Sequence, residues 1–166
     1  QSSSLTSIEI PASVKELGES AFLYCFYLKT VTFKGTALKE IKGRTFFDAW
    51  ALETITIPDG VTTIGESAFE GCTSLKTVSL PNSVTEIQKH AFINCALEKL
   101  VIPDGTTSIE EDVFACDNLE TVYIPASVTY INKYAFKYCL NVTIVAPAGS
   151  YAETFAKTNK IPFQAL

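Results

Sequence analysis

Apolar and polar positions along the chain repeat with a period of about 23 residues. From Leu5 the chain reads Leu-x-x-Ile-x-Ile-Pro, passes through a turn and a short apolar pair, and ends in Ala-Phe-x-x-Cys. The pattern restarts at Leu28, Leu52, Leu75, Leu97 and Leu119. A fixed period of this size is the signature of stacked repeats, each of which buries its apolar face against the next. The pattern therefore predicts a solenoid.

Each repeat predicts two strands and the turns that join them. In the Leu-x-x-Ile-x-Ile stretch, exemplified by Leu52, Ile55 and Ile57, apolar and polar residues alternate as in a half-buried strand. Proline follows this strand in most repeats, where its missing N–H ends the hydrogen-bonded ladder. A second short extended pair comes next, such as Val61 and Ile64. Stacked copies of the first strand are expected to form one parallel sheet, with strands about 4.8 Å apart.

Two columns of side chains are expected inside the solenoid. One is formed by the phenylalanines of the turn that closes each repeat: Phe22, Phe46, Phe69, Phe92, Phe114 and Phe136. The other is formed by small residues soon after them: Cys25, Ala49, Cys72, Cys95, Cys116 and Cys139. A position that accepts cysteine or alanine is a small buried apolar site. Metal binding is disfavoured because no Cys-x-x-Cys pair occurs, and the odd number of cysteines does not indicate a disulfide framework.

The whole chain, residues 1–166, is predicted to form one domain. Its six repeats span residues 5–27, 28–51, 52–74, 75–96, 97–118 and 119–141, and a C-terminal cap spans 142–166. The cap is expected to begin with a partial seventh rung, followed by a short helix from Gly149 to Lys157. Ser150 fits the N-cap of that helix, with Glu153 three residues later. An extended piece around Ile161 closes the chain and covers the end of the core.

Composition changes this picture little, but it excludes some classes of protein. Of the 166 residues, 47% are hydrophobic and 19% charged, which is a globular rather than a disordered composition. The net charge of -5 disfavours nucleic acid as a partner, because phosphate binding requires an excess of Lys and Arg. No apolar run is long enough to span a bilayer, so no membrane insertion is expected in this fragment. The chain contains neither methionine nor a signal peptide, and is expected to be a mature fragment or a trimmed piece of a longer protein.

The repeats resemble the leucine-rich repeats of the BspA-like, Treponema pallidum-type family. Residues 5–141 carry the resemblance, in six consecutive copies with proline after the strand in place of an asparagine ladder. The resemblance implies a mainly β, α/β repeat solenoid: a right-handed superhelix with one parallel sheet, short second strands and short helical turns. It also implies a secreted or bacterial cell-surface location and adhesion to host or other cell-surface proteins. Family membership conveys no catalytic residues and does not identify the ligand.

Enzymatic chemistry is not expected. An active site requires converging acid, base or nucleophilic groups. The single histidine, His90, occupies a variable, mostly polar turn position, and the adjacent Gln88 and Lys89 offer no general-base partner. The acidic run that begins at Glu110 lacks the ligand spacing and the glycine of a calcium loop. No cofactor, metal or catalytic residue is therefore predicted.

A strip of hydroxyl groups on the exposed face of the main sheet is the first candidate binding surface. Strand alternation directs these side chains outward: Thr30, Thr32, Thr54, Thr56, Thr77, Ser79, Thr121 and Tyr123. Solenoids commonly bind partners through such an extended face. Threonine is also favoured in strands for its β-branching. The sequence leaves both explanations open.

A cluster of aromatic residues in the turns of the first two repeats is the second candidate. It consists of Tyr24, Phe26, Tyr27, Phe47 and Trp50. Aromatic side chains are enriched at binding hot spots. The alternative is that these rings pack against each other or against a portion that precedes residue 1. Most equivalent positions in later repeats are small or polar, such as Glu70 and Thr73.

Charge is distributed unevenly, with lysines concentrated in residues 28–51 and carboxylates in residues 97–118. Such asymmetry can orient a partner, and it can also simply keep a solenoid soluble. The leading hypothesis is a non-enzymatic recognition or adhesion domain that binds protein ligands through the solenoid surface. A structural spacer within a larger surface protein and a carbohydrate-binding module are the alternatives.

Overall fold

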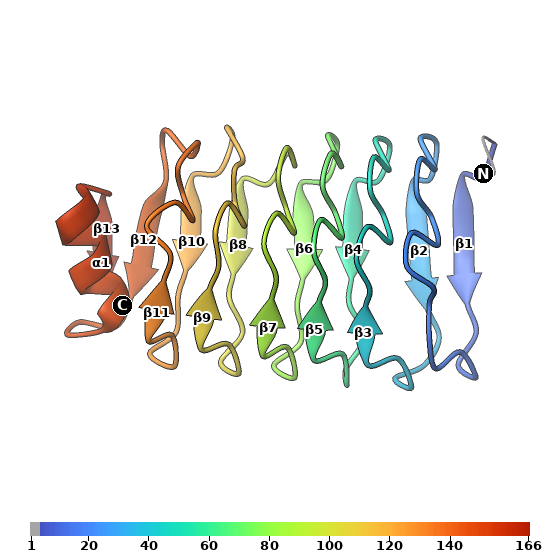
Figure 1. The fold of residues 1–166 in the computed structure, drawn as a ribbon, viewed down its shortest axis with the longest axis horizontal. Coiled ribbons are helices and arrows are strands. Elements are labelled where there is room, and N and C mark those ends of the chain that lie inside the picture. The colour runs from blue at the N-terminus through green and yellow to red at the C-terminus, as the bar shows by residue number, and fades with distance from the viewer. Residues whose placement is uncertain (1–3) are drawn as a thin grey trace.

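A row of short parallel strands forms one long side of the molecule, as the apolar-polar alternation predicts (Figure 1). The computed structural model describes residues 4–166. The row contains β1 (Ser7–Ile10), β2 (Thr30–Phe33), β4 (Thr54–Thr56), β6 (Thr77–Ser79), β8 (Lys99–Val101), β10 (Thr121–Tyr123) and β12 (Thr143–Ala146). In each three-residue strand the central side chain is buried, and it lies between outer positions that face away from the core.

A second row of two-residue strands runs in the opposite direction along the other side of the solenoid (Figure 1). It contains β3 (Glu40–Ile41), β5 (Thr63–Ile64), β7 (Glu86–Ile87), β9 (Ser108–Ile109) and β11 (Tyr130–Ile131). The two rows enclose the core, so the chain is a parallel β-solenoid of the leucine-rich-repeat type. Short helical turns were expected, but the turns contain left-handed residues that a helix does not accommodate, such as Ser67 with φ of 56°.

The two columns predicted inside the solenoid are present. The six phenylalanine rings stack in sequence, with neighbouring centroids 5.3 to 6.5 Å apart. Each of the five cysteines is buried and free, and Ala49 occupies the corresponding buried position in the second repeat. Close stacking of identical side chains from repeat to repeat forms one continuous apolar core.

The C-terminal end of the core is covered as predicted. Helix α1 (Tyr151–Asn159) begins after the N-cap Ser150, whose hydroxyl accepts a hydrogen bond from the Glu153 N–H at 3.2 Å. Its buried residues include Phe155, which adds a seventh ring beside Phe136. Tyr151, by contrast, is 42% exposed. Strand β13 (Phe163–Ala165) pairs with β12 and forms the last strand of the main sheet.

The main sheet is interrupted at two places, whereas one unbroken sheet was expected. Its parallel ladders join β1 to β2, β4 to β6, and β8 through β10 and β12 to β13. Within residues 4–166, no ladder joins β2 to β4 or β6 to β8. We call these gaps the first seam (β2–β4) and the second seam (β6–β8). At the second seam the other sheet is interrupted as well, because β7 is not paired with β9.

The seams coincide with a change of side chain at the last inward position of the main strand. Isoleucine occupies this position in most repeats and is almost fully buried, as at Ile57, Ile102 and Ile124. The strand before the first seam carries Phe33 there, and the strand before the second carries Leu80. Both of these side chains are only partly buried. Both differ in shape from the β-branched isoleucine, and we attribute the separation of the next strand to this difference in packing.

Candidate binding surface

The hydroxyl strip predicted from the sequence lies on the outer face of the main sheet. Thr30, Thr32, Thr54, Thr56, Thr77 and Ser79 are exposed, and Thr121 and Tyr123 are partly exposed. None of these eight hydroxyl groups makes a side-chain hydrogen bond within the described part of the chain. Other hydroxyls do bond internally; for example, Thr45 donates to the Lys42 carbonyl at 2.7 Å. The strip therefore presents a row of donors and acceptors available to a partner.

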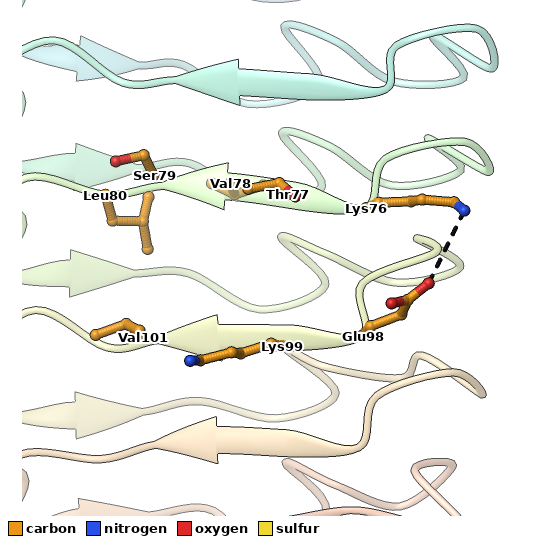
Figure 2. Close-up of a pocket in the computed structure, with 8 residues that line it drawn as sticks. All are labelled: Lys76, Thr77, Val78, Ser79, Leu80, Glu98, Lys99 and Val101. Carbon is orange, nitrogen blue, oxygen red and sulfur yellow. Dashed lines mark ion pairs between the residues drawn. The ribbon is translucent and has the colours of Figure 1, made fainter.

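A groove of about 650 Å³ opens on this face at the second seam (Figure 2). Thr77 and Ser79 of β6 form one wall, and Lys99 and Val101 of β8 form the other. Leu80 projects from the end of β6 toward the gap and contributes an apolar surface (Figure 2). Val101 adds to that surface, because its side chain is 55% exposed.

A smaller groove of about 250 Å³ follows the first seam. Its hydroxyl groups come from β2 and β4, namely Thr30, Thr32, Thr54 and Thr56. Phe33 occupies the position that Leu80 has in the larger groove. Six of the eight strip residues therefore line one of the two grooves. The sequence predicted the exposure of these residues, but it did not predict the grooves.

Charged side chains along the strip are largely neutralised by their neighbours. Lys34 and Glu9 form an ion pair at 2.9 Å. Lys76 faces Glu98 at 3.9 Å at one end of the larger groove (Figure 2). The Lys99 ammonium lies 4.5 Å from the centre of the Tyr123 ring, a cation–π contact. The two ion pairs balance their own charges, whereas the Tyr123 ring carries no net charge and leaves the Lys99 ammonium positive at the larger groove.

Four of the five residues of the predicted aromatic cluster pack against one another. The Phe26 and Trp50 rings stack with centroids 4.2 Å apart, and Tyr24 contacts Phe47 edge-on at 5.9 Å. Tyr27 is 60% exposed and belongs to none of the ring pairs in the described residues. Trp50 is 48% exposed, so one side of the stacked pair faces solvent. The rings stabilise each other, as one of the two sequence interpretations proposed.

A second aromatic group was missed by the sequence reasoning. Tyr134 and Tyr138 are exposed in the turn of the sixth repeat, and Lys133 and Lys137 lie over their rings at 4.5 to 5.7 Å. Tyr138 directly precedes a cysteine of the column, as Tyr24 does in the first repeat. Alignment of the repeats against each other would have revealed this pair of tyrosines.

The buried cysteines are oriented for packing. Each thiol from Cys72 onward points toward a phenylalanine carbonyl of the preceding repeat, as in Cys72 to Phe46 at 3.2 Å. Burial raises the pKa of Cys72 to about 12. At neutral pH this thiol is therefore protonated and a poor nucleophile.

His90 is partly buried in a turn, where its φ of 63° is left-handed. Across residues 4–166, no group of three or more His, Cys, Asp or Glu side chains is placed to hold a metal ion. No helix in the same range is long and apolar enough to cross a membrane.

Comparisons with solved structures identify the same fold in bacterial proteins. The leucine-rich repeat protein of Treponema pallidum superposes with a TM-score of 0.78 at 27% identity, over 98% of this chain and 73% of that one. A leucine-rich repeat protein from Eubacterium ventriosum matches with a TM-score of 0.70 at 19% identity, over 86% of this chain and 40% of that one. The pneumococcal vaccine antigen PcpA matches with a TM-score of 0.50 at 15% identity, over 98% of this chain and 68% of that one. No curated protein matches the chain.

The model of the BspA-type leucine-rich repeat region matches residues 1–57 and 39–160, in six copies. These ranges cover nearly the entire chain and include every strand of the main row. Leucine-rich repeat solenoids are in general non-enzymatic scaffolds that mediate protein interactions. The chain belongs to the BspA-type leucine-rich repeat family.

Proposed function

We propose that this chain is a non-enzymatic adhesion or recognition domain that binds a protein ligand across the hydroxyl strip. The observation that carries the proposal is the set of eight outward hydroxyl groups without intrachain hydrogen bonds, six of them lining grooves. Donors and acceptors on a flat strand face can bond a partner without first breaking an internal contact. The grooves supply the apolar recesses that hold anchor side chains at protein interfaces.

A location outside the cell, on a bacterial surface or secreted, is part of this proposal. Its support is membership of the BspA-type family, together with an exposed face suited to contact with other macromolecules. Lys34 and Lys76 are ion-paired and Lys99 is a single remaining cation on the strip, which disfavours nucleic acid as the partner, since phosphate binding depends on clustered positive charge.

The test compares two variants with the same added charge. Thr56→Lys/Ser79→Lys places two lysines on the strip, and Thr107→Lys/Thr129→Lys places two on exposed positions elsewhere in the repeats. Each is passed over a panel of immobilised extracellular-matrix and cell-surface proteins by surface plasmon resonance. We expect the wild-type chain and the second variant to bind the same protein, and the first variant to lose that binding.

Two results would overturn the proposal. Equal binding by both variants would place recognition away from the strip. Absence of binding to every protein of the panel by a folded wild-type chain would favour the structural spacer, in which the solenoid only separates other parts of a longer protein.

Carbohydrate binding is a second candidate, favoured by the solvent-facing stack of Phe26 and Trp50. An exposed indole face is a common platform for apolar and stacking contacts. Trp50→Ala and Tyr123→Ala are each expected to lose signals on a glycan array if this candidate is correct. Signals unchanged in both variants would exclude these two rings as the sugar platform.

A further inference from the structure

Two cysteines of the buried column, Cys95 and Cys116, lie on either side of the second seam, in the fourth and fifth repeats. Immediately before them the Asn94 N–H donates to the Ala115 carbonyl at 3.0 Å, so the two turns are bonded directly to each other at this point. Segments joined by such bonds lie about 4.8 Å apart, and a disulfide spans Cα–Cα distances of about 4.4–6.8 Å. The backbone therefore holds the two cysteines within bridging distance.

The turn that carries Cys116 is one residue shorter than the corresponding turns. Cys116 follows Phe114 by two positions, whereas Cys72 follows Phe69 by three. The Cys116 N–H accordingly donates to the Phe114 carbonyl two residues back, while the Cys72 N–H donates to the Phe69 carbonyl three residues back. The shorter turn gives the Cys116 side chain a different starting direction from that of Cys72.

The Cys95 and Cys116 thiols are in contact with each other. The Cys116 thiol donates to the Phe92 carbonyl at 2.9 Å, within the turn that carries Cys95. The Cys95 thiol in turn donates a hydrogen bond to the Cys116 sulfur, and the described residues contain no other thiol–thiol hydrogen bond. This bond lowers the pKa of Cys116, whereas burial raises that of Cys95. Cys116 is therefore the thiol that ionises first and is the better nucleophile.

A surface recess of about 320 Å³ borders the pair. Its lining residues include sequence neighbours of both cysteines, namely Ile93, Asn94, Ala115 and Asp117. The thiols themselves are buried, Cys95 being 5% and Cys116 0% exposed. Neither strand row is paired across this interface, so local opening there costs less than elsewhere and admits a small oxidant.

We propose that Cys95 and Cys116 form a redox-active pair, which a peroxide converts into a disulfide that reinforces the second seam. The Cys116 thiolate attacks one peroxide oxygen, the O–O bond breaks, and Cys116 becomes a sulfenic acid. The hydroxide that leaves takes up the proton that Cys116 released. The Cys95 sulfur then attacks the Cys116 sulfur, the S–O bond breaks, and the departing hydroxide takes the Cys95 proton. Two thiols thus lose two electrons and two protons, and the peroxide is reduced to two waters.

The disulfide covalently joins the fourth and fifth repeats at the one interface where both strand rows lack a ladder in the described residues. A cross-link also restricts the unfolded chain, so the oxidised protein is expected to unfold at a higher urea concentration than the reduced protein. This inference concerns the core and does not depend on which ligand the strip binds.

Hydrogen peroxide added to the native chain provides the test, followed by alkylation of the remaining thiols in urea and tryptic mass spectrometry. Cleavage after Lys and Arg places each cysteine on a separate peptide, so a link is identified by the peptides it joins. We expect one link, between the peptides 90–99 and 100–133, with alkylation of the other cysteines. The mass should fall by about 2 Da for the two hydrogens lost, and dithiothreitol should reverse the change.

Cys95→Ala and Cys116→Ala should each abolish the link, and Cys139→Ala, the matched control, should retain it. Alanine is accepted at this position, since Ala49 occupies it in the second repeat, so all three variants are expected to fold. Oxidation should raise the urea midpoint of the wild-type chain and of Cys139→Ala but not of Cys95→Ala. The absence of a link in the folded wild-type chain, links among other cysteines in comparable yield, or a linked chain with an unchanged midpoint would overturn the proposal.

Discussion

The ring centroids of Phe92 and Phe114 lie 6.5 Å apart, about 1 Å more than the 5.4 Å between Phe69 and Phe92. The wider interval occurs at the second seam, where neither strand row has a ladder between the fourth and fifth repeats. Backbone bonds across this interface persist in the turns, from the Phe92 N–H to the Val113 carbonyl and from the Asn94 N–H to the Ala115 carbonyl. Loosened core stacking and missing strand pairing therefore occur at the same place.

Hydrogen exchange should locate this interface. We expect the amides of β6 to β9 that face the gap to exchange faster than those in the paired β4–β6 and β8–β10 ladders, because strand pairing protects amides from local opening. Amide exchange of the folded chain, followed by mass spectrometry or NMR, provides the measurement. Leu80→Ile should slow exchange at the gap and raise the free energy of unfolding by about 1 kcal/mol, the value of a typical net hydrogen bond. Uniform protection along the solenoid would contradict the expectation.

The loss of stability on truncating a ring of the phenylalanine column should depend on the position of that ring in the column. Phe69 is fully buried between two stacked rings, so Phe69→Ala is expected to lower the free energy of unfolding by about 3–5 kcal/mol. Phe22 has a single ring neighbour in the column and 9% exposure, and Phe22→Ala should cost less. Urea denaturation followed by circular dichroism measures both. A larger loss at Phe22 would mean that the column does not transmit stability from repeat to repeat.

The buried thiols should make stability depend on pH in the alkaline range. Burial holds the pKa of Cys72 at about 12, whereas a thiol in the unfolded chain ionises near pH 8.5. Above about pH 9 the unfolded chain therefore releases a proton that the folded chain retains, and stability falls as pH rises from about 9 to 12. Cys72→Ala should show a shallower fall in the midpoint of urea unfolding over this window, relative to its own value at pH 7. A slope identical to that of the wild-type chain would show that Cys72 is not the group responsible.

Trp50 offers a spectroscopic test of the aromatic cluster. Its ring stacks on Phe26 at 4.2 Å, so Phe26→Ser should expose the indole, shift its emission to longer wavelength and increase quenching by acrylamide. The matched control is Tyr27→Ser, because Tyr27 is adjacent in sequence but outside the ring pairs. Its emission should remain that of the wild-type chain. Equal shifts in both variants would indicate a general loosening of the turn.

The repeat alone was sufficient to predict the strands, the two columns and the cap. Those features depend on residue type at a fixed position, as Phe69 and Cys72 illustrate, and a one-dimensional pattern records type and position directly. The exposure of the hydroxyl strip was predictable for the same reason, since alternation along a strand assigns each side chain to a face. Whether the strip and the aromatic cluster bind a ligand is still a prediction.

The seams were not predictable from the same pattern. Phe33 and Leu80 are apolar residues at an apolar position, so they match the repeat as well as Ile57 does. Their effect depends on how the shape of each side chain fits against the next strand, which is a property of two adjacent repeats. The grooves, and with them the larger part of the candidate binding surface, arise from this three-dimensional fit.

The second seam also has a mechanical consequence. In a solenoid each repeat contacts only its neighbours, so a tension applied along its length passes through every interface in series. The interface that lacks strand pairing in both rows resists least, and under load the chain should extend there first, between the fourth and fifth repeats. Four repeats would remain folded on one side, and two repeats with the cap on the other. Leu80 therefore lies at the interface that should open first when the molecule is stretched.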